Sequence, residues 1–298
     1  MDMIPTLFFY ASLVNDVRSL IARNDLAAAE RQVRATESRS GATPEIAEAF
    51  SWLARGALNA KSFDQADAFA SETRQRCDQL LAGRKLDAEP HLPTALGASI
   101  EVHAQVLAAR GERSQAIQFL QEQARQFAPT SIIERIRKNI NLLSLEGKPA
   151  PPLDLRDWFS ARPQPQAEWR GHAVLLFFWA HWCPDCKAEA PLLAEAIRSF
   201  APKGLLAIAP TRLYGYAAGG AESTPDRERA YIEAVWGRSY SELSGVPVAV
   251  SAANFQTYGS STTPTIVLLD AAGIVRLYHP GAVTAAELSA RIQAVLGK

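Results

Sequence analysis

Residues 174–187 read VLLFFWAHWCPDCK, and this stretch determines the fold of the half of the chain in which it lies. Six successive apolar residues, 174–179, predict a strand that is buried on both faces. The helical periodicity of residues 183–200 predicts a helix directly after that strand. Two cysteines, Cys183 and Cys186, therefore stand where a strand meets the N-terminus of a helix.

This placement suits the cysteine pair to thiol–disulfide exchange. Unpaired backbone N–H groups and the helix dipole favour a thiolate at Cys183, and the thiolate is the nucleophilic form. Cys186 is close enough to attack a mixed disulfide formed by Cys183. Pro184 suits the first helical position, and Trp182 offers a flat apolar wall beside the sulfur. Asp185 opposes thiolate formation, which favours a reductant over a strong oxidant. A zinc half-site or an inert pair is the alternative, but zinc would need further ligands nearby.

The rest of the second half alternates strands with helices. The apolar runs predict strands at 205–209, 246–250, 265–270 and 274–278, and helices are predicted at 225–238, 252–258 and 284–296. Thr284 is placed to cap the last helix, with Glu287 at its third position. Residues 211–244 read as an insertion. A strand–helix–strand unit followed by a hairpin and a helix predicts a three-layer α/β domain around a mixed sheet.

The first half predicts helix after helix from about residue 10 to residue 145. A polar turn followed by a helix with alanine in its first turns recurs at 24–29, 61–66 and 111–116, at unequal intervals. This pattern resembles degenerate tetratricopeptide-type hairpins, in which small residues let paired helices approach closely. A generic helical bundle is the open alternative.

A domain boundary is predicted at the proline-rich segment that begins at Gly147. Residues 147–152 read GKPAPP and cannot continue a helix, because proline lacks the N–H and clashes with the preceding turn. We therefore predict a helical domain over residues 1–146 and an α/β domain over residues 147–298.

Composition excludes several classes of function. The 31 Lys and Arg residues balance 31 Asp and Glu residues, which argues against a nucleic-acid partner. Three cysteines are too few for a fold that is held together by several disulfides. Cys77 is expected to be a small buried hydrophobic residue. The five histidines show no metal-ligand spacing. No metal and no cofactor is expected beyond the redox-active Cys183–Cys186 pair.

The N-terminus carries a short apolar run, residues 4–14, IPTLFFYASLV. The run is far too short to span a bilayer, and no transmembrane segment is predicted. Asp2 precedes it and no Lys or Arg does, which is unlike a secretory leader. The run is either a clipped or displaced leader or the first helix of the domain.

Residues 178–191, FWAHWCPDCKAEAP, resemble the active-site stretch of the TlpA/ResA family, thioredoxin-like proteins of the bacterial cell envelope. Residues 147–151 also resemble the segment by which that family enters the domain. The segment Thr263-Pro264-Thr265 resembles the family's cis-proline loop. The resemblance covers residues 147–298. It implies a thioredoxin fold, thiol–disulfide oxidoreductase activity and a periplasmic or cell-envelope location. A cis Pro264 would leave backbone groups of Thr263 facing the disulfide, available to an extended substrate.

The resemblance also implies roles for individual residues. Cys183 attacks, Cys186 resolves, and Glu189 is the acidic residue near the thiols. Ordinary thioredoxin has a buried aspartate at the position that Phe177 holds in this chain. The phenylalanine side chain cannot accept or donate a proton. If a carboxylate assists Cys186, Glu189 is therefore the candidate, and the alternative is a surface glutamate of the first helical turns.

Four further residues carry open interpretations. His181 could polarise Cys183 as a cation or lie exposed in its loop. His279 could be a copper ligand or could simply end a strand. Tyr214 and Tyr216 could line a substrate groove or pack against the domain.

The implied partners are protein thiol or disulfide substrates and a dithiol electron donor, with a possible protein partner on the helical domain. Two other functions remain open. The chain could be a partner-binding adaptor whose thioredoxin domain is chiefly a scaffold, or a peroxidase. The intact cysteine pair argues against the first of these and the local cysteine pattern against the second.

Overall fold

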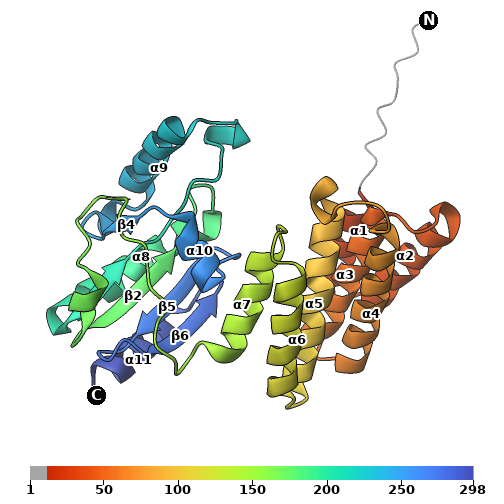
Figure 1. The fold of residues 1–298 in the computed structure, drawn as a ribbon, viewed down its shortest axis with the longest axis horizontal. Coiled ribbons are helices and arrows are strands. Elements are labelled where there is room, and N and C mark those ends of the chain that lie inside the picture. The colour runs from red at the N-terminus through yellow and green to blue at the C-terminus, as the bar shows by residue number, and fades with distance from the viewer. Residues whose placement is uncertain (1–11, 298) are drawn as a thin grey trace, which may run out of the picture. The chain divides into compact units, whose positions relative to one another are not determined.

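The structure is a computed structural model and describes residues 12–297 (Figure 1). The chain forms two compact units, Met1–Ile136 and Arg137–Lys298. Most of the apolar run at 4–14 lies outside the described residues, and its last two residues begin helix α1, Leu13–Ala22. Between residues 12 and 297, no helix combines the length and apolarity needed to cross a membrane.

The first unit is built from three helical hairpins. They are α1 with α2 (Leu26–Ser40), α3 (Pro44–Asn59) with α4 (Phe63–Leu80), and α5 (His91–Ala109) with α6 (Arg113–Gln126) (Figure 1). A short 3-10 helix, Leu86–Ala88, precedes α5. Each hairpin turns at one of the three predicted polar segments, so the repeated pattern in the sequence is confirmed as a repeated helical hairpin.

The three turns share one geometry. Each begins with a residue of positive φ, and these residues are Asn24, Lys61 and Gly111. The next N–H then donates to a carbonyl five positions earlier, in the bonds Asp25–Leu20, Ser62–Ala57 and Glu112–Leu107, at 2.9–3.0 Å. The alanine of each following helix, Ala29, Ala66 or Ala116, is fully buried. A larger side chain there would force the paired helices apart.

The two units divide within α7 (Ile133–Ser144), ahead of the boundary predicted at residue 146. The Asn141 side chain donates to the Tyr258 carbonyl at 2.8 Å, and Leu145 lies in the core of the second unit. A Cβ on Gly259 would come within 2.5 Å of the Lys138 backbone nitrogen. The prolines after Gly147 mark where a helix must stop. The contacts that define the second unit already begin within α7, ahead of these prolines.

A mixed sheet forms the centre of the second unit. Its strands are ordered β3 (Leu205–Ile208), β2 (Ala173–Phe178), β5 (Thr265–Leu269) and β6 (Val275–Pro280). β2 and β3 are parallel, whereas β5 runs antiparallel to both β2 and β6. A separate two-stranded sheet pairs β1 (Trp158–Phe159) with β4 (Val248–Ala249). The mixed sheet is confirmed, but the sequence did not predict β1.

Helices cover both faces of the sheet. α8 (Pro184–Phe200), α9 (Pro225–Ser239) and α11 (Ala285–Leu296) contribute to the same core cluster as Leu175 and Phe177 of β2. α10 (Ala252–Tyr258) packs against Leu176 and Phe178 on the other face. Because neighbouring side chains of a strand point to opposite faces, an uninterrupted apolar run can fill both cores. The three-layer prediction is thus confirmed.

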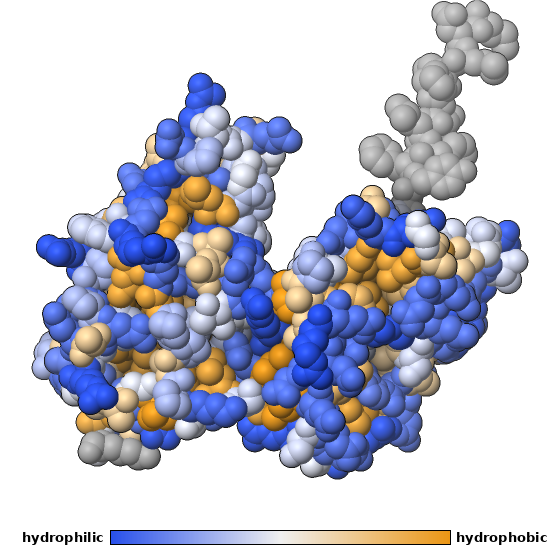
Figure 2. All heavy atoms as spheres, in the orientation of Figure 1, coloured by the Kyte–Doolittle hydropathy of each residue, from blue (hydrophilic) through white to orange (hydrophobic). Residues whose placement is uncertain are grey.

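Short elements complete the second unit. Four 3-10 helices lie at Gln166–Trp169, Ala201–Lys203, Ala218–Gly220 and Ser241–Leu243. The Thr284 hydroxyl accepts the Glu287 N–H at 3.2 Å, which confirms the predicted cap of α11. The face drawn in Figure 2 is largely hydrophilic, and hydrophobic patches interrupt it on both units.

Candidate active site

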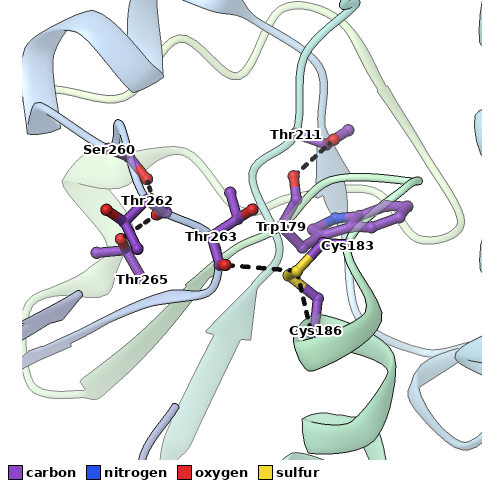
Figure 3. Close-up of a disulfide and its surroundings, with 8 residues drawn as sticks. All are labelled: Trp179, Cys183, Cys186, Thr211, Ser260, Thr262, Thr263 and Thr265. Carbon is purple, nitrogen blue, oxygen red and sulfur yellow. Dashed lines mark hydrogen bonds between the residues drawn. A yellow bond between two sulfur atoms is a disulfide. The ribbon is translucent and has the colours of Figure 1, made fainter. Parts of the chain in front are cut away.

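Cys183 and Cys186 form a disulfide at the N-terminus of α8 (Figure 3). Cys183 is the N-cap residue, and its Sγ accepts the Cys186 backbone N–H at 3.0 Å. Pro184 follows at the first helical position, where its missing N–H costs no hydrogen bond. The Cys183 sulfur thus meets a backbone N–H and the positive end of the helix dipole. Both favour its thiolate once the disulfide is reduced.

The loop before β5 lies against this disulfide. The Thr263–Pro264 peptide bond is cis, as predicted. The Thr263 carbonyl oxygen lies 3.4 Å from the Sγ of Cys183 (Figure 3). The Thr265 hydroxyl donates to the Thr262 carbonyl at 2.6 Å, which fixes the turn from within. Backbone of this loop therefore borders the sulfur on the side opposite the helix N-terminus.

Glu189 is buried one turn beyond Cys186, with 5% of its surface exposed. Its Oε1 accepts the backbone N–H of Val283. In the part of the chain that the structure describes, its Oε2 has no hydrogen-bond partner. Burial raises the pKa of Glu189, the Val283 N–H and His279 oppose the rise, and Asp185 adds to it. The surface-glutamate interpretation is wrong, whereas a part in catalysis stays a prediction.

Phe177, which the resemblance matches to the aspartate of ordinary thioredoxin, lies in strand β2. Its ring is 4% exposed and lies 6.2 Å from the ring of Tyr240, centroid to centroid. This position is apolar and packs in the core, so it supplies no proton acceptor.

His181 is buried rather than exposed. Its Nε2 lies 3.0 Å from the Tyr216 carbonyl oxygen and 4.0 Å from a carboxylate oxygen of Glu228. Burial lowers the pKa of His181, Glu228 opposes the fall, and Lys187 adds to it. A neutral imidazole is therefore favoured near neutral pH, which counts against the cationic role weighed for it.

The tyrosines of the insertion gather around His181. Tyr214 stacks on the imidazole with centroids 5.6 Å apart, and Tyr216 and Tyr231 contact its ring at 5.5 and 5.4 Å. Trp182 meets Tyr214 edge to face at 5.6 Å and is 47% exposed. Tyr214 and Tyr216 thus pack against the domain directly behind the disulfide motif, and Trp182 lies in the open beside it.

The two remaining candidates, His279 and Cys77, are not part of this cluster around the disulfide. His279 is half-buried on β6, with Nδ1 3.3 Å from the Gly281 carbonyl oxygen. No group of three metal-binding side chains occurs over residues 12–297. Cys77 is fully buried in the first unit, and burial raises its pKa to about 12. The expected role of Cys77 as a buried hydrophobe is confirmed.

Sequence reasoning missed Glu228 and Thr211. The carboxylate of Glu228 is 1% exposed and accepts the backbone N–H groups of Tyr214 and Gly215 at 2.5 and 2.8 Å. The Thr211 hydroxyl donates to the Trp179 carbonyl at 3.0 Å (Figure 3). No local pattern marks either residue, because each acts on backbone that is distant in the sequence.

The chain is similar to known proteins in the region that carries the disulfide. Residues 165–296 match the family model of the thioredoxin-like domain. The chain is 26% identical over 147 residues to the thioredoxin-like protein YneN of Bacillus subtilis (strain 168). The matched region covers 49% of this chain and 78% of YneN.

Two solved structures are also similar. A thiol-disulfide isomerase from Corynebacterium glutamicum is 20% identical, with coverage of 51% of this chain and 98% of that chain and a TM-score of 0.41. The exposed lipoprotein thioredoxin Etrx1 of Streptococcus pneumoniae strain TIGR4 is 25% identical, with coverage of 43% and 88% and a TM-score of 0.34.

Proposed function

We propose that this thiol–disulfide oxidoreductase, whose second unit contains a thioredoxin-like domain, reduces disulfides in protein substrates. The observation that carries the proposal is the position of Cys183 between the N-terminus of α8 and the Thr263 carbonyl. The helix end activates the sulfur, and the loop backbone offers hydrogen bonds to an extended chain that carries the disulfide.

The reaction proceeds in two exchanges. The Cys183 thiolate attacks one sulfur of the substrate disulfide, a Cys183–substrate bond forms, and the other substrate sulfur leaves as a thiolate that takes up a proton. Cys186 then loses its proton and attacks Cys183, which releases the second substrate thiol. The substrate gains two electrons, and the Cys183–Cys186 disulfide is regenerated for an external dithiol to reduce.

Two side chains favour the reducing direction. Asp185 is exposed in the first turn of α8, where its negative charge opposes a thiolate at Cys183. His181 is held neutral by burial, so it adds no compensating positive charge. A strong oxidant requires a stabilised reduced form, and neither neighbour stabilises the thiolate.

Glu189 serves the second exchange. Cys186 is fully buried, and burial disfavours its charged form. Glu189 stands three positions further along α8, and its Oε2 can accept the Cys186 proton directly or through water. A pKa that burial raises makes this carboxylate a better proton acceptor near neutral pH.

The setting of the protein follows from the resemblance to TlpA and ResA. Over residues 147–298, that resemblance supports a periplasmic or cell-envelope location. The three helical hairpins support a tetratricopeptide-like first unit, which would bind a protein partner. Fractionation of the native full-length product tests the location, since recovery only from cytosol would contradict it.

Two assays on the full chain test the proposed reaction. Reduction of insulin disulfides with a dithiol donor is expected, without peroxide consumption. The reduction potential of the Cys183–Cys186 couple, measured against glutathione, tests the direction, because 30 mV corresponds to about 1.4 kcal/mol. A potential near that of the oxidant DsbA, about −120 mV, would overturn the reducing assignment.

A further inference from the structure

Two arginines of the first unit share one tryptophan ring. The guanidinium carbons of Arg18, on α1, and Arg55, on α3, lie 4.6 and 4.5 Å from the centre of the Trp52 ring. Stacking on an indole stabilises a guanidinium but does not neutralise its charge. Over residues 12–297, neither guanidinium donates a hydrogen bond or forms an ion pair. Two positive charges thus lie on one ring without an anion bound to either.

The carboxylates that act on Arg55 are held by other partners. These carboxylates belong to Glu48 and Glu101. An oxygen of Glu48 lies 2.7 Å from the Nδ1 of His91. The Nε of Arg135 donates to Glu101 at 2.6 Å. Both carboxylates are therefore engaged elsewhere, and the charge of Arg55 has no direct counter-ion among them.

Arg55 keeps its charge in an unfavourable place. Burial is the main cause that lowers the pKa of Arg55 to about 10. The positive charge of Arg135 adds to the fall, and so does that of Arg18. Glu101 and Glu48 oppose it. Because burial without a counter-ion disfavours the charged form, an anion bound beside this guanidinium would offset the penalty.

A cavity of about 220 Å³ is lined in part by Arg55, and its lining comes from α1, α3 and α5, the first helices of the three hairpins (Figure 1). The lining includes the apolar side chains of Ile21, Leu58 and Val102 and the polar side chain of Asn59. A water molecule in the liquid takes about 30 Å³, so the cavity has room for a side chain of several heavy atoms. A group that fits this lining has an aliphatic part and ends in a negative charge.

We propose that this cavity, named here the Arg55 cavity, binds a glutamate side chain from an acidic segment of a partner protein. Arg55 pairs with the carboxylate, and Arg18 provides a second positive charge beside it. The inference rests on the proposed binding of a protein partner by the first unit and specifies the chemistry of that partner.

The charge and the lining argue for this occupant. The two methylene groups of a glutamate suit the apolar lining, and its carboxylate can accept two parallel N–H groups from one guanidinium. The 31 Lys and Arg residues of the chain are balanced by 31 Asp and Glu residues, so the chain lacks the excess of cations that a nucleic acid requires. Since α3 contacts both α1 and α5, an extended segment laid across these helices can reach the cavity and Arg18 together.

The first test is selection of binding peptides. Random short peptides displayed on phage are selected on the immobilised full chain, and the best peptide is synthesised as selected and with its glutamate replaced by glutamine. We expect selection to enrich glutamate at one position, and we expect the glutamine peptide to bind about tenfold more weakly or worse by calorimetry. Selection without an enriched glutamate, or equal Kd values for the two peptides, would overturn the proposal. Glutarate binding as tightly as the peptide would also overturn it, in favour of a small-molecule site.

Variants assign the binding to the cavity. Arg55→Gln is expected to weaken binding of the glutamate peptide about tenfold or more and to leave the glutamine peptide almost unaffected, because the two changes remove the same ion pair. Arg31→Gln makes the same change at an exposed arginine of α2 and should keep the wild-type Kd. An unchanged Kd in Arg55→Gln, or an equal loss in both variants, would contradict the assignment.

Stability separates a binding role of Arg55 from a structural one. Arg55→Gln removes a charge that burial disfavours, so its urea midpoint should be no lower than that of the wild type, whereas a structural arginine would lower it. Should Arg55→Gln fail to fold, Arg18→Gln decides, because Arg18 is exposed and its loss should weaken binding of the glutamate peptide several-fold. Unchanged binding in that variant would refute the proposal. A wild-type chain that binds the peptide without reducing insulin would refute the proposed reductase alone, and the reverse result would refute the cavity alone.

Discussion

The backbone N–H of Val283 donates a hydrogen bond to the buried carboxylate of Glu189, which lies 94 positions earlier in the chain. This bond engages Oε1 and leaves Oε2 without a partner over the described residues. Cys186 and Glu189 are three positions apart on α8, and residues at that spacing lie on the same side of a helix. The carboxylate is thus oriented, with one oxygen available.

Glu189→Gln is expected to slow resolution of the mixed disulfide on the order of tenfold or more, because the amide cannot take the Cys186 proton. The amide oxygen can still accept the Val283 N–H, so the fold should persist. Single-turnover kinetics separate this step from the first attack by Cys183, which should barely change. Glu195→Gln, exposed on the same helix, is the control. Identical resolution rates from about pH 6 to about pH 9 would place the proton path elsewhere.

The raised pKa of Glu189 also predicts a pH dependence of stability. Above the ordinary value of 4.5 the unfolded chain loses this proton while the folded chain retains it. The free energy of unfolding should therefore fall as pH rises from there through the folded pKa. Glu189→Gln should lack this part of the fall. Urea unfolding of the oxidised protein and the variant at about pH 4 and about pH 8 measures it, and parallel curves would contradict it.

The three cysteines of the reduced protein should differ in reactivity. Iodoacetamide should modify Cys183 first, because the helix N-terminus favours its thiolate. Cys77 should react only on unfolding, since it is fully buried with a pKa of about 12. Cys186→Ser should accumulate mixed disulfides with substrates, and Cys183→Ser should not. Peptide mapping by mass spectrometry gives the order, and equal rates at all three sites would refute it.

Two fragments test where the second unit begins. A fragment of residues 137–298 should fold and retain dithiol chemistry. A fragment of residues 147–298 should be less stable by about 2 kcal/mol or more, because it lacks Leu145 from the core. It also lacks the Asn141 bond to Tyr258 and the Glu146 carboxylate that accepts the Tyr278 N–H. Urea midpoints compare the fragments, and coincident midpoints would favour the boundary at the prolines.

The sequence predicted the fold best where local patterns suffice. Strand β2 was predictable because its apolar run fills two cores at once. The turns at Asn24 and Lys61 were predictable because polar residues there break helices of regular periodicity. Strand β1 has two residues, too few for any periodicity, and exists only through the pairing of Trp158 and Phe159 with β4.

The site was predictable in its chemistry more than in its surroundings. Spacing alone identified Cys183 and Cys186, and the resemblance pointed to Glu189 and a cis Pro264. Whether Glu189 is buried depends on Val283, and whether His181 is buried depends on a loop 35 positions away. Neither contact leaves a local pattern in the sequence.

Two indoles near the disulfide differ in their contact with solvent. Trp182 is 47% exposed, whereas Trp179 is fully buried among Trp236 and Tyr240. A disulfide quenches the fluorescence of a neighbouring indole, and solvent shifts the emission of an exposed indole to longer wavelength. Opening of the disulfide should therefore brighten the indole emission, at the red edge of the spectrum for Trp182 and at the blue edge for Trp179. The chain carries its own optical reporter of redox state.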